Sequence, residues 1–164
     1  MTLRIGDEAP SFDVTSSDGK RLRLEDYRGK KVVVLYFYPK DNTRVCTAEA
    51  CGFRDMYEDL VGKDTEIIGV SIDSDSSHRG FAEKHRLPFP LVADPDKALA
   101  RRYGATGGMI GLLGLTKRVT FVIDKNGRVA GVFDSMTSAG QHLDGVKQTV
   151  ARLQSQSPSP SPTT

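Results

Sequence analysis

The chain has 164 residues, a length that suits one domain with a substantial core, and 38% of them are apolar and 27% charged. Its 23 basic and 21 acidic side chains leave a net charge of +2, which gives no electrostatic reason to expect nucleic acid as a partner. No apolar run approaches the length that spans a bilayer, and residues 1–8 resemble neither a secretory signal nor a transit peptide. We therefore expect a soluble cytoplasmic protein that does not contact a membrane.

The first half of the chain predicts a hairpin and then two buried strands joined by a helix. Turn residues 16–20 separate the short alternating stretches 12–15 and 21–24, which favours a β-hairpin. The apolar run within 31–38 predicts a strand buried on both faces and ended by Pro39. A helix is expected over 43–61, capped by Asn42 or Thr43, with a second buried strand at 66–72. The inner face of that helix is marked by Phe53, Met56, Tyr57 and Leu60.

The second half predicts further alternation of helices and strands. In chain order we first expect a loop at 73–77, a helix at 79–86, a strand at 91–93 and a helix from 95 to about 103. A hairpin follows, in which a turn at 124–127 joins a strand at 119–123 to its antiparallel partner at 128–133. The last helix is expected at 139–153. This order indicates an α/β fold, with a central mixed sheet flanked by helices and an N-terminal β-hairpin. We expect a single domain over 1–153 and a disordered Ser/Pro tail over 154–164.

The two cysteines of the chain, Cys46 and Cys51, lie near the start of the helix predicted at 43–61. The unpaired N–H groups and dipole of a helix N-terminus favour a thiolate, which is a nucleophile and can be oxidised. Cys46 precedes Phe53 by nearly two turns and so lies close to the inner face, whereas Cys51 points roughly the opposite way. Helix geometry separates their Cα atoms by roughly 8–9 Å, and a disulfide rarely tolerates more than about 7 Å. Oxidation and local unwinding must therefore be coupled, or no disulfide forms.

Taken alone, the two cysteines leave several kinds of site open. A single cysteine usually packs as a small hydrophobe, although in a reducing compartment a pair is more often catalytic or metal-binding than structural. Zinc lacks ligands, because His78, His85 and His142 form no paired spacing with the cysteines and are expected to be plain surface or packing residues. A thioredoxin-type oxidoreductase would have two residues between its cysteines, and this chain has four. A non-enzymatic redox sensor or chaperone could use the same two thiols.

Pro39, Thr43 and Cys46 follow a proline–three–threonine–two–cysteine spacing, and in this the chain resembles the peroxiredoxins. Residues 37–41, Cys46, Glu49, Cys51 and 53–55 are similar to the bacterioferritin-comigratory-protein/Q subgroup, and the resemblance covers about 3–153. One departure is Arg44-Val45, where the subgroup usually has proline-glycine. The resemblance implies a thioredoxin-like fold and a monomeric thiol peroxidase that reduces hydrogen peroxide and organic hydroperoxides. It also implies recycling by a thioredoxin-type reductant, and no metal, haem or flavin cofactor.

The resemblance further assigns roles to single residues. Cys46 would be the peroxidatic thiolate and Cys51 the resolving cysteine, which together would form an intramolecular disulfide. The hydroxyl of Thr43 would bind the peroxide and the sulfur, and Pro39 would shield the pocket from water.

A cation is expected to reach Cys46 from a distant part of the chain. Arg118, directly before the strand predicted at 119–123, matches the family's arginine, which would favour the thiolate and stabilise the leaving oxygen. Glu49 would orient Arg118, and Lys117 is the competing cation. The glycine-rich segment 104–115 lacks the glycine-lysine-serine/threonine ending of a phosphate-binding loop. We expect it to be a mobile apolar loop that flanks the pocket and favours apolar peroxides or docking of the reductant.

Overall fold

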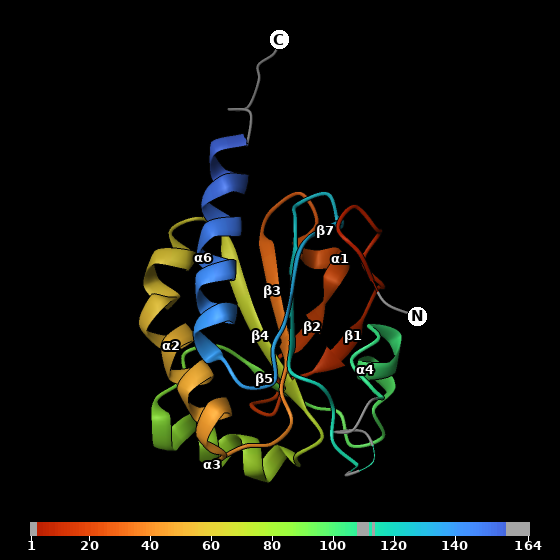
Figure 1. Cartoon of the computed structure of the whole chain (residues 1–164), viewed down its shortest axis with the longest axis vertical. Coiled ribbons are helices and arrows are strands. Elements are labelled where there is room, and N and C mark those ends of the chain that lie inside the picture. Colours follow the sequence, from red (N-terminus) through yellow and green to blue (C-terminus); the bar gives the residue numbers. More distant parts are fainter. Residues whose placement is uncertain (1–2, 108–111, 113, 157–164) are drawn as a thin grey trace.

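A five-stranded mixed sheet forms the centre of the computed structural model, which describes residues 3–107, 112 and 114–156 (Figure 1). In chain order the elements are β1 (Asp13–Thr15), β2 (Arg21–Arg23), α1 (Leu24–Tyr27), β3 (Val32–Phe37), α2 (Arg44–Val61), β4 (Thr65–Ser71), α3 (Asp75–His85), β5 (Leu91–Ala93), α4 (Ala98–Arg102), β6 (Val119–Ile123), β7 (Val129–Asp134) and α6 (Ala139–Gln156). The predicted α/β order is thus confirmed, as is the N-terminal hairpin, in which β1 pairs antiparallel with β2. Within the described residues, no helix is both long and apolar enough to cross a bilayer.

The strand order β5-β4-β3-β6-β7 places β3 at the centre of the sheet. Strands β4 and β5 run parallel to β3, whereas β6 is antiparallel to β3 and β7 is antiparallel to β6. In the β3–β6 pair, Phe37 at the end of β3 lies opposite Val119 at the start of β6. The antiparallel register therefore brings the segment that leaves β3 beside the segment that enters β6, although some 80 residues separate them along the chain.

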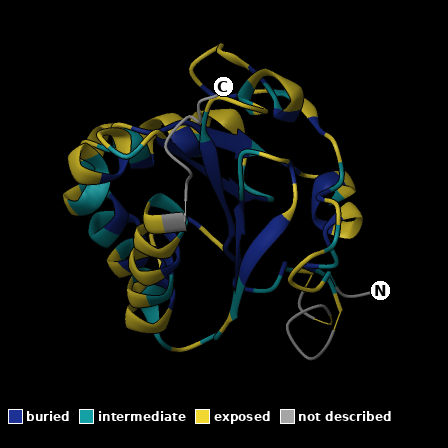
Figure 2. Ribbon diagram, turned by 90° about the horizontal axis from the view of Figure 1, so that it is seen from above, coloured by how far each residue is buried: buried dark blue, intermediate teal, exposed yellow. Residues whose placement is uncertain are grey.

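Two apolar layers, one on each face of the sheet, form the core. Alternate side chains of β3 point to opposite faces, so Val33 and Leu35 pack with residues of α1 and α4, whereas Val34 and Tyr36 pack with residues of α2, α3 and α6. Figure 1 shows α2 and α6 side by side over the second face, and Figure 2 shows the buried strands between the two helical layers. All of β3 is buried, which confirms the prediction of a strand covered on both faces.

The helices differ most from the prediction, and α4 spans only Ala98–Arg102 rather than 95 to about 103. Helix α3 begins at Asp75 rather than at Arg79, because the Ser74 hydroxyl accepts a hydrogen bond from the backbone N–H of Ser77 and so caps the helix there. The short helix α1 follows β2 directly and was not predicted. Helix α6 continues to Gln156, so residues 154–156 of the expected disordered tail are helical. The rest of that tail, and residues 108–111 and 113 of the glycine-rich segment, lie outside the described residues.

Candidate active site

Cys46 lies in the first turn of α2, where the chain enters the helix after leaving β3. Pro39 follows the end of the strand, Asn42 takes a left-handed backbone conformation with φ of 64°, and Thr43 occupies the N-cap position. The Cys46 side chain points inward and is only 1% exposed, which confirms its expected place on the inner face. A sulfur in the first turn lies near the positive end of the helix dipole, which attracts negative charge.

Arg118 reaches the sulfur from the segment that enters β6, at the same end of the sheet. The residue is only 3% exposed, and its guanidinium donates from Nη2 to Cys46 Sγ at 3.1 Å and from Nη1 to Glu49 Oε1 at 2.9 Å. A third bond runs from Nε to the Met136 carbonyl oxygen at 3.2 Å. Because the planar fork holds several donors in fixed directions, these partners orient one N–H at the sulfur.

Arg118 is held beside the end of β3 by its position before β6 and by a hydrogen bond of its neighbour Thr116. Residue 118 directly precedes β6, and the hydroxyl of Thr116 donates to the carbonyl oxygen of Tyr38 at 3.1 Å. Lys117, the competing cation, is less deeply buried, and its backbone N–H donates to the carbonyl oxygen of Ala105. The structure thus brings Arg118 to Cys46, as the sequence predicts.

Glu49 is fully buried on α2, one turn after Cys46, and its carboxyl group ionises with difficulty. Burial raises the pKa of Glu49 from 4.5 to about 7, against the opposing attraction of Arg118. Its second oxygen, Oε2, has no hydrogen-bond partner by geometry, although it lies 3.4 Å from Nδ1 of His142. The two atoms are close, and a hydrogen bond between them requires that one of them carry a proton.

His142 on α6 is buried behind Glu49, so of the predicted surface or packing roles the structure shows the buried one, with polar contacts on both ring nitrogens. Its Nε2 faces the carbonyl oxygen of Ser135 at 2.8 Å, and its Nδ1 lies 2.7 Å from the hydroxyl oxygen of Thr120. A carbonyl oxygen only accepts, so Nε2 carries the proton. Burial lowers the pKa of His142, which favours the neutral ring, and the lone pair on Nδ1 accepts from the hydroxyl of Thr120.

Thr43 and Pro39 stand at the mouth of the site. Pro39 is buried, as expected of a residue that shields the sulfur. Thr43 is exposed, and its hydroxyl donates to the carbonyl oxygen of Lys40 at 2.8 Å. The idea that this hydroxyl caps α2 is therefore wrong, because the N-cap residue makes no side-chain bond to the helix. No hydrogen bond between Thr43 and Cys46 occurs among the described contacts, so binding of peroxide by Thr43 stays a prediction.

Cys51 lies on the other side of α2 from Cys46, and both thiols are free. It is half-buried, and its Sγ lies 3.7 Å from Nδ1 of His85, the last residue of α3. Arg54, one turn further along α2, donates to the carbonyl oxygen of His85 at 2.8 Å. The contact between Cys51 and His85 joins residues 34 positions apart on different helices, so no local spacing in the sequence could predict it.

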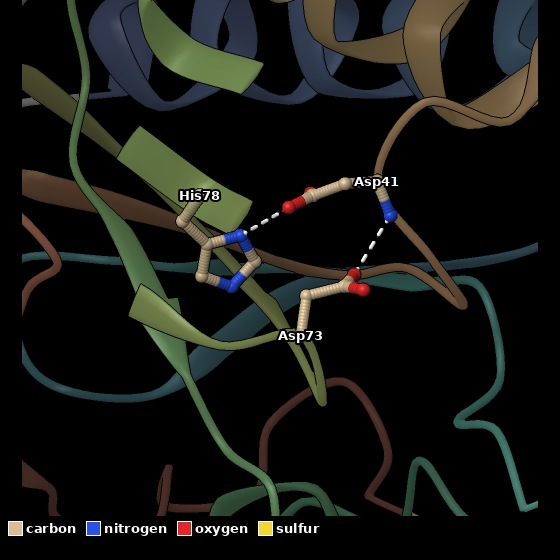
Figure 3. A group of neighbouring side chains, drawn as sticks. All are labelled: Asp41, Asp73 and His78. Atoms are coloured by element: carbon tan, nitrogen blue, oxygen red, sulfur yellow. Dashed lines mark hydrogen bonds and ion pairs between the residues drawn. The ribbon is translucent and has the colours of Figure 1, made fainter. Parts of the chain in front are cut away.

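His78, the third histidine, belongs to a buried network with Asp41 and Asp73 (Figure 3). Its Nδ1 lies 2.7 Å from Asp41 Oδ2, and its Nε2 lies 3.1 Å from the Val92 carbonyl oxygen. Asp73 accepts from the backbone N–H of Asp41 at 2.7 Å. These three side chains are of types that can bind a metal ion, but the hydrogen bonds among them already account for their arrangement. The network fixes the segment between β3 and α2, on which Pro39 and Thr43 lie.

A hollow of about 380 Å³ adjoins the first turn of α2 and is lined by Arg44, Val45, Ala48, Thr137 and Ala139. A larger hollow, about 750 Å³ between segment 8–13 and α1, is lined by neither cysteine. Cys46 itself lines neither hollow, and the hollow beside α2 is lined by its chain neighbours Arg44 and Val45.

Comparisons with known proteins show the family to which the chain belongs. Residues 5–132 match the AhpC/TSA family. The chloroplastic peroxiredoxin Q of Gentiana triflora is 41% identical, and the match covers 92% of this chain and 66% of that protein. Peroxiredoxin Bcp of Bacillus subtilis is 44% identical, and the match covers 79% of this chain and 83% of that protein. The crystal structure of peroxidoxin BcpB from Mycobacterium tuberculosis superimposes with a TM-score of 0.83 at 33% identity, over 92% of this chain and 98% of that one.

Proposed function

The chain belongs to the AhpC/TSA family, and we propose that it is a thiol peroxidase of the peroxiredoxin Q/Bcp type that reduces hydrogen peroxide and organic hydroperoxides. The observation that carries this proposal is the 3.1 Å contact between Arg118 and the sulfur of Cys46 at the start of α2. The guanidinium of Arg118 and the N-terminus of α2 lie where they can stabilise negative charge on the attacking sulfur and on the leaving oxygen.

In the first step, the Cys46 thiolate attacks one oxygen of the peroxide. The O–O bond breaks, the sulfur becomes a sulfenic acid, and the other oxygen leaves as alkoxide or hydroxide and takes up a proton to give alcohol or water. Arg118 stabilises the charge that develops on the leaving oxygen, and Glu49 holds the guanidinium in place through its 2.9 Å bond. Thr43 orients the peroxide with its hydroxyl, and Pro39 keeps bulk water from the sulfur.

In the second step, the Cys51 thiol condenses with the sulfenic acid, which forms the intramolecular disulfide and releases water. The two sulfurs lie on different sides of an intact α2, so the start of the helix must unwind first. Oxidation itself promotes this, since a neutral sulfenic acid attracts Arg118 less than a thiolate does. A thioredoxin-type reductant then reopens the disulfide by thiol exchange.

The remaining parts of the proposal concern partners and location. A disulfide within one chain needs no second copy, which fits a monomer, and the near-balanced charge of +2 gives no electrostatic reason to expect nucleic acid as a partner. A cytoplasmic location stays a prediction, because several relatives are named chloroplastic.

The two cysteine variants test the cycle. Cys46→Ser is expected to consume no peroxide, and persistent turnover in this variant would refute the nucleophile. Cys51→Ser is expected to form the sulfenic acid once, to lose thioredoxin-coupled turnover and to become over-oxidised. Turnover of many peroxide equivalents by the wild-type protein separates the enzyme from a redox sensor, which would be oxidised only stoichiometrically.

A further inference from the structure

The thiol of Cys51 has a basic neighbour of its own. His85 closes α3, and its Nδ1 lies 3.7 Å from the sulfur of Cys51 on α2. The ring packs edge-on against Phe81, with centroids 5.0 Å apart, which restricts its rotation. Arg54 binds the carbonyl oxygen of the same histidine at 2.8 Å and so connects the end of α3 to α2. The contact between the sulfur and the ring nitrogen is therefore held from both helices.

The geometry points to His85 as the general base that activates the resolving cysteine. This inference rests on the proposed function, because it requires that Cys51 attack the sulfenic acid of Cys46. His85 touches the reacting sulfur, and it adds a catalytic residue to the second step rather than to the reduction of peroxide.

The step balances without a further reagent. The lone pair on Nδ1 takes the proton of the Cys51 thiol, and the thiolate attacks the sulfur of the Cys46 sulfenic acid. The new S–S bond forms as the S–O bond breaks, and the leaving hydroxide takes up the proton from the imidazolium to become water. The neutral histidine is restored for the next turnover.

The position of His85 also indicates which sulfur moves. Cys46 lies in the first turn of α2, whereas Cys51 is attached to α3 through His85 and Arg54. Unwinding of the residues before Cys51 can therefore carry Cys46 to the activated thiolate while Cys51 keeps its base. The reverse movement would break the contact with His85 before the thiol reacts.

Charged side chains of both helices lie near this pair. On α2, Arg54 provides a cation, which also donates from Nε to Oδ1 of Asp55 at 3.0 Å. The pKa of Arg54 is raised, first by the bond to Asp55 and then by the charge of Cys51. On α3, the neighbour of His85 is Lys84, which is exposed to solvent. Lys84→Gln therefore serves as a matched control that changes a charge next to His85 without touching the sulfur.

The first experiment measures the reactivity of Cys51 without any peroxide. Cys46→Ser leaves Cys51 as the only thiol, and its rate of alkylation by iodoacetamide at pH 7 reports the thiolate present. An ordinary thiol is only a few per cent ionised at this pH, so adding His85→Ala is expected to slow alkylation about 3- to 30-fold. Added imidazole should restore part of the rate, and Lys84→Gln should leave it unchanged. An unchanged rate, or a loss that imidazole does not restore, would overturn the proposal.

The second experiment follows a single turnover in the reduced full-length protein. His85→Ala, and His85→Gln as a variant closer in size, are expected to slow disulfide formation about 3- to 30-fold, to prolong the sulfenic acid and to increase over-oxidation. Formation of the sulfenic acid should change less than twofold. If Cys51→Ser blocks the disulfide while both His85 variants form it at the wild-type rate, the His85 proposal alone is refuted. If Cys51→Ser keeps full thioredoxin-coupled turnover, the resolving role of Cys51 fails as well.

Discussion

Replacement of Glu49 by glutamine is expected to stabilise the folded protein at alkaline pH while it weakens catalysis. The carboxylate is fully buried, and burial raises the pKa of Glu49 from 4.5 to about 7 although Arg118 is bound to it. A rise of this size costs the folded state about 3 kcal/mol once the group is ionised. Below pH 4.5 the group is protonated in both states, so the cost appears as the pH rises through 4.5 to 7 and is complete above pH 7.

A glutamine fits the place of the protonated acid. Its amide oxygen can accept from Nη1 of Arg118, and its amide N–H₂ can occupy the position of Oε2, 3.4 Å from Nδ1 of His142, whose lone pair already accepts from Thr120. The variant therefore avoids the cost of an ionised carboxylate and leaves one group at this position without a full hydrogen bond, as Oε2 is in the wild type. Catalysis should still weaken, about tenfold in the rate of sulfenic-acid formation, because a neutral partner orients the guanidinium less strongly than a charged one.

Urea unfolding of the reduced proteins at pH 5 and pH 8 measures this effect. The difference in unfolding free energy between Glu49→Gln and wild type is expected to grow by about 2.5 kcal/mol between pH 5 and pH 8, which corresponds to roughly 5–10 °C in Tm. Glu58→Gln, an exposed change on the same helix, is the control and should show no such pH dependence. Parallel pH profiles for wild type and Glu49→Gln, or a less stable variant at pH 8, would refute the reasoning.

Two further substitutions test the contacts around the site. Arg118→Lys keeps a positive charge but loses the fork that binds Cys46 and Glu49 together, so the second-order rate with peroxide should fall about 10²-fold; a loss of less than threefold in stopped-flow assays would contradict this. Asp41→Ala removes the buried partner of His78 and should lower the unfolding free energy by about 3–5 kcal/mol in urea, and a loss below about 1 kcal/mol would show that the network contributes little.

The sequence predicts the parts of this fold in which local pattern and burial agree. Strand β3 is a continuous apolar run, as a strand covered on both faces requires, and the spacing from Cys46 to Phe53 places both on the inner face of α2. The start of α3 is less clear in the sequence because several Ser and Asp residues before it can each cap a helix, and only the structure identifies Ser74.

The surroundings of the site depend on contacts between distant segments. Arg118 could be assigned through its match to a family pattern, whereas composition and periodicity do not distinguish it from Lys117. His142 and His85 look like ordinary helix residues in the sequence, and they acquire their roles because α6 and α3 pack against α2 at the positions of Glu49 and Cys51. A search for histidine spacing relative to the cysteines cannot find them, since each contact spans more than 30 residues and two helices.

The pairing of Phe37 with Val119 has a consequence for the newly made chain. Arg118 reaches the sulfur only when β6 has joined β3 in this register, and a slip by one residue would turn the neighbouring side chains to the opposite face of the sheet. A ribosome-bound chain that has emerged only as far as β5 has Cys46 but lacks Arg118. The contact between the guanidinium and the sulfur therefore forms last, when β6 completes the sheet.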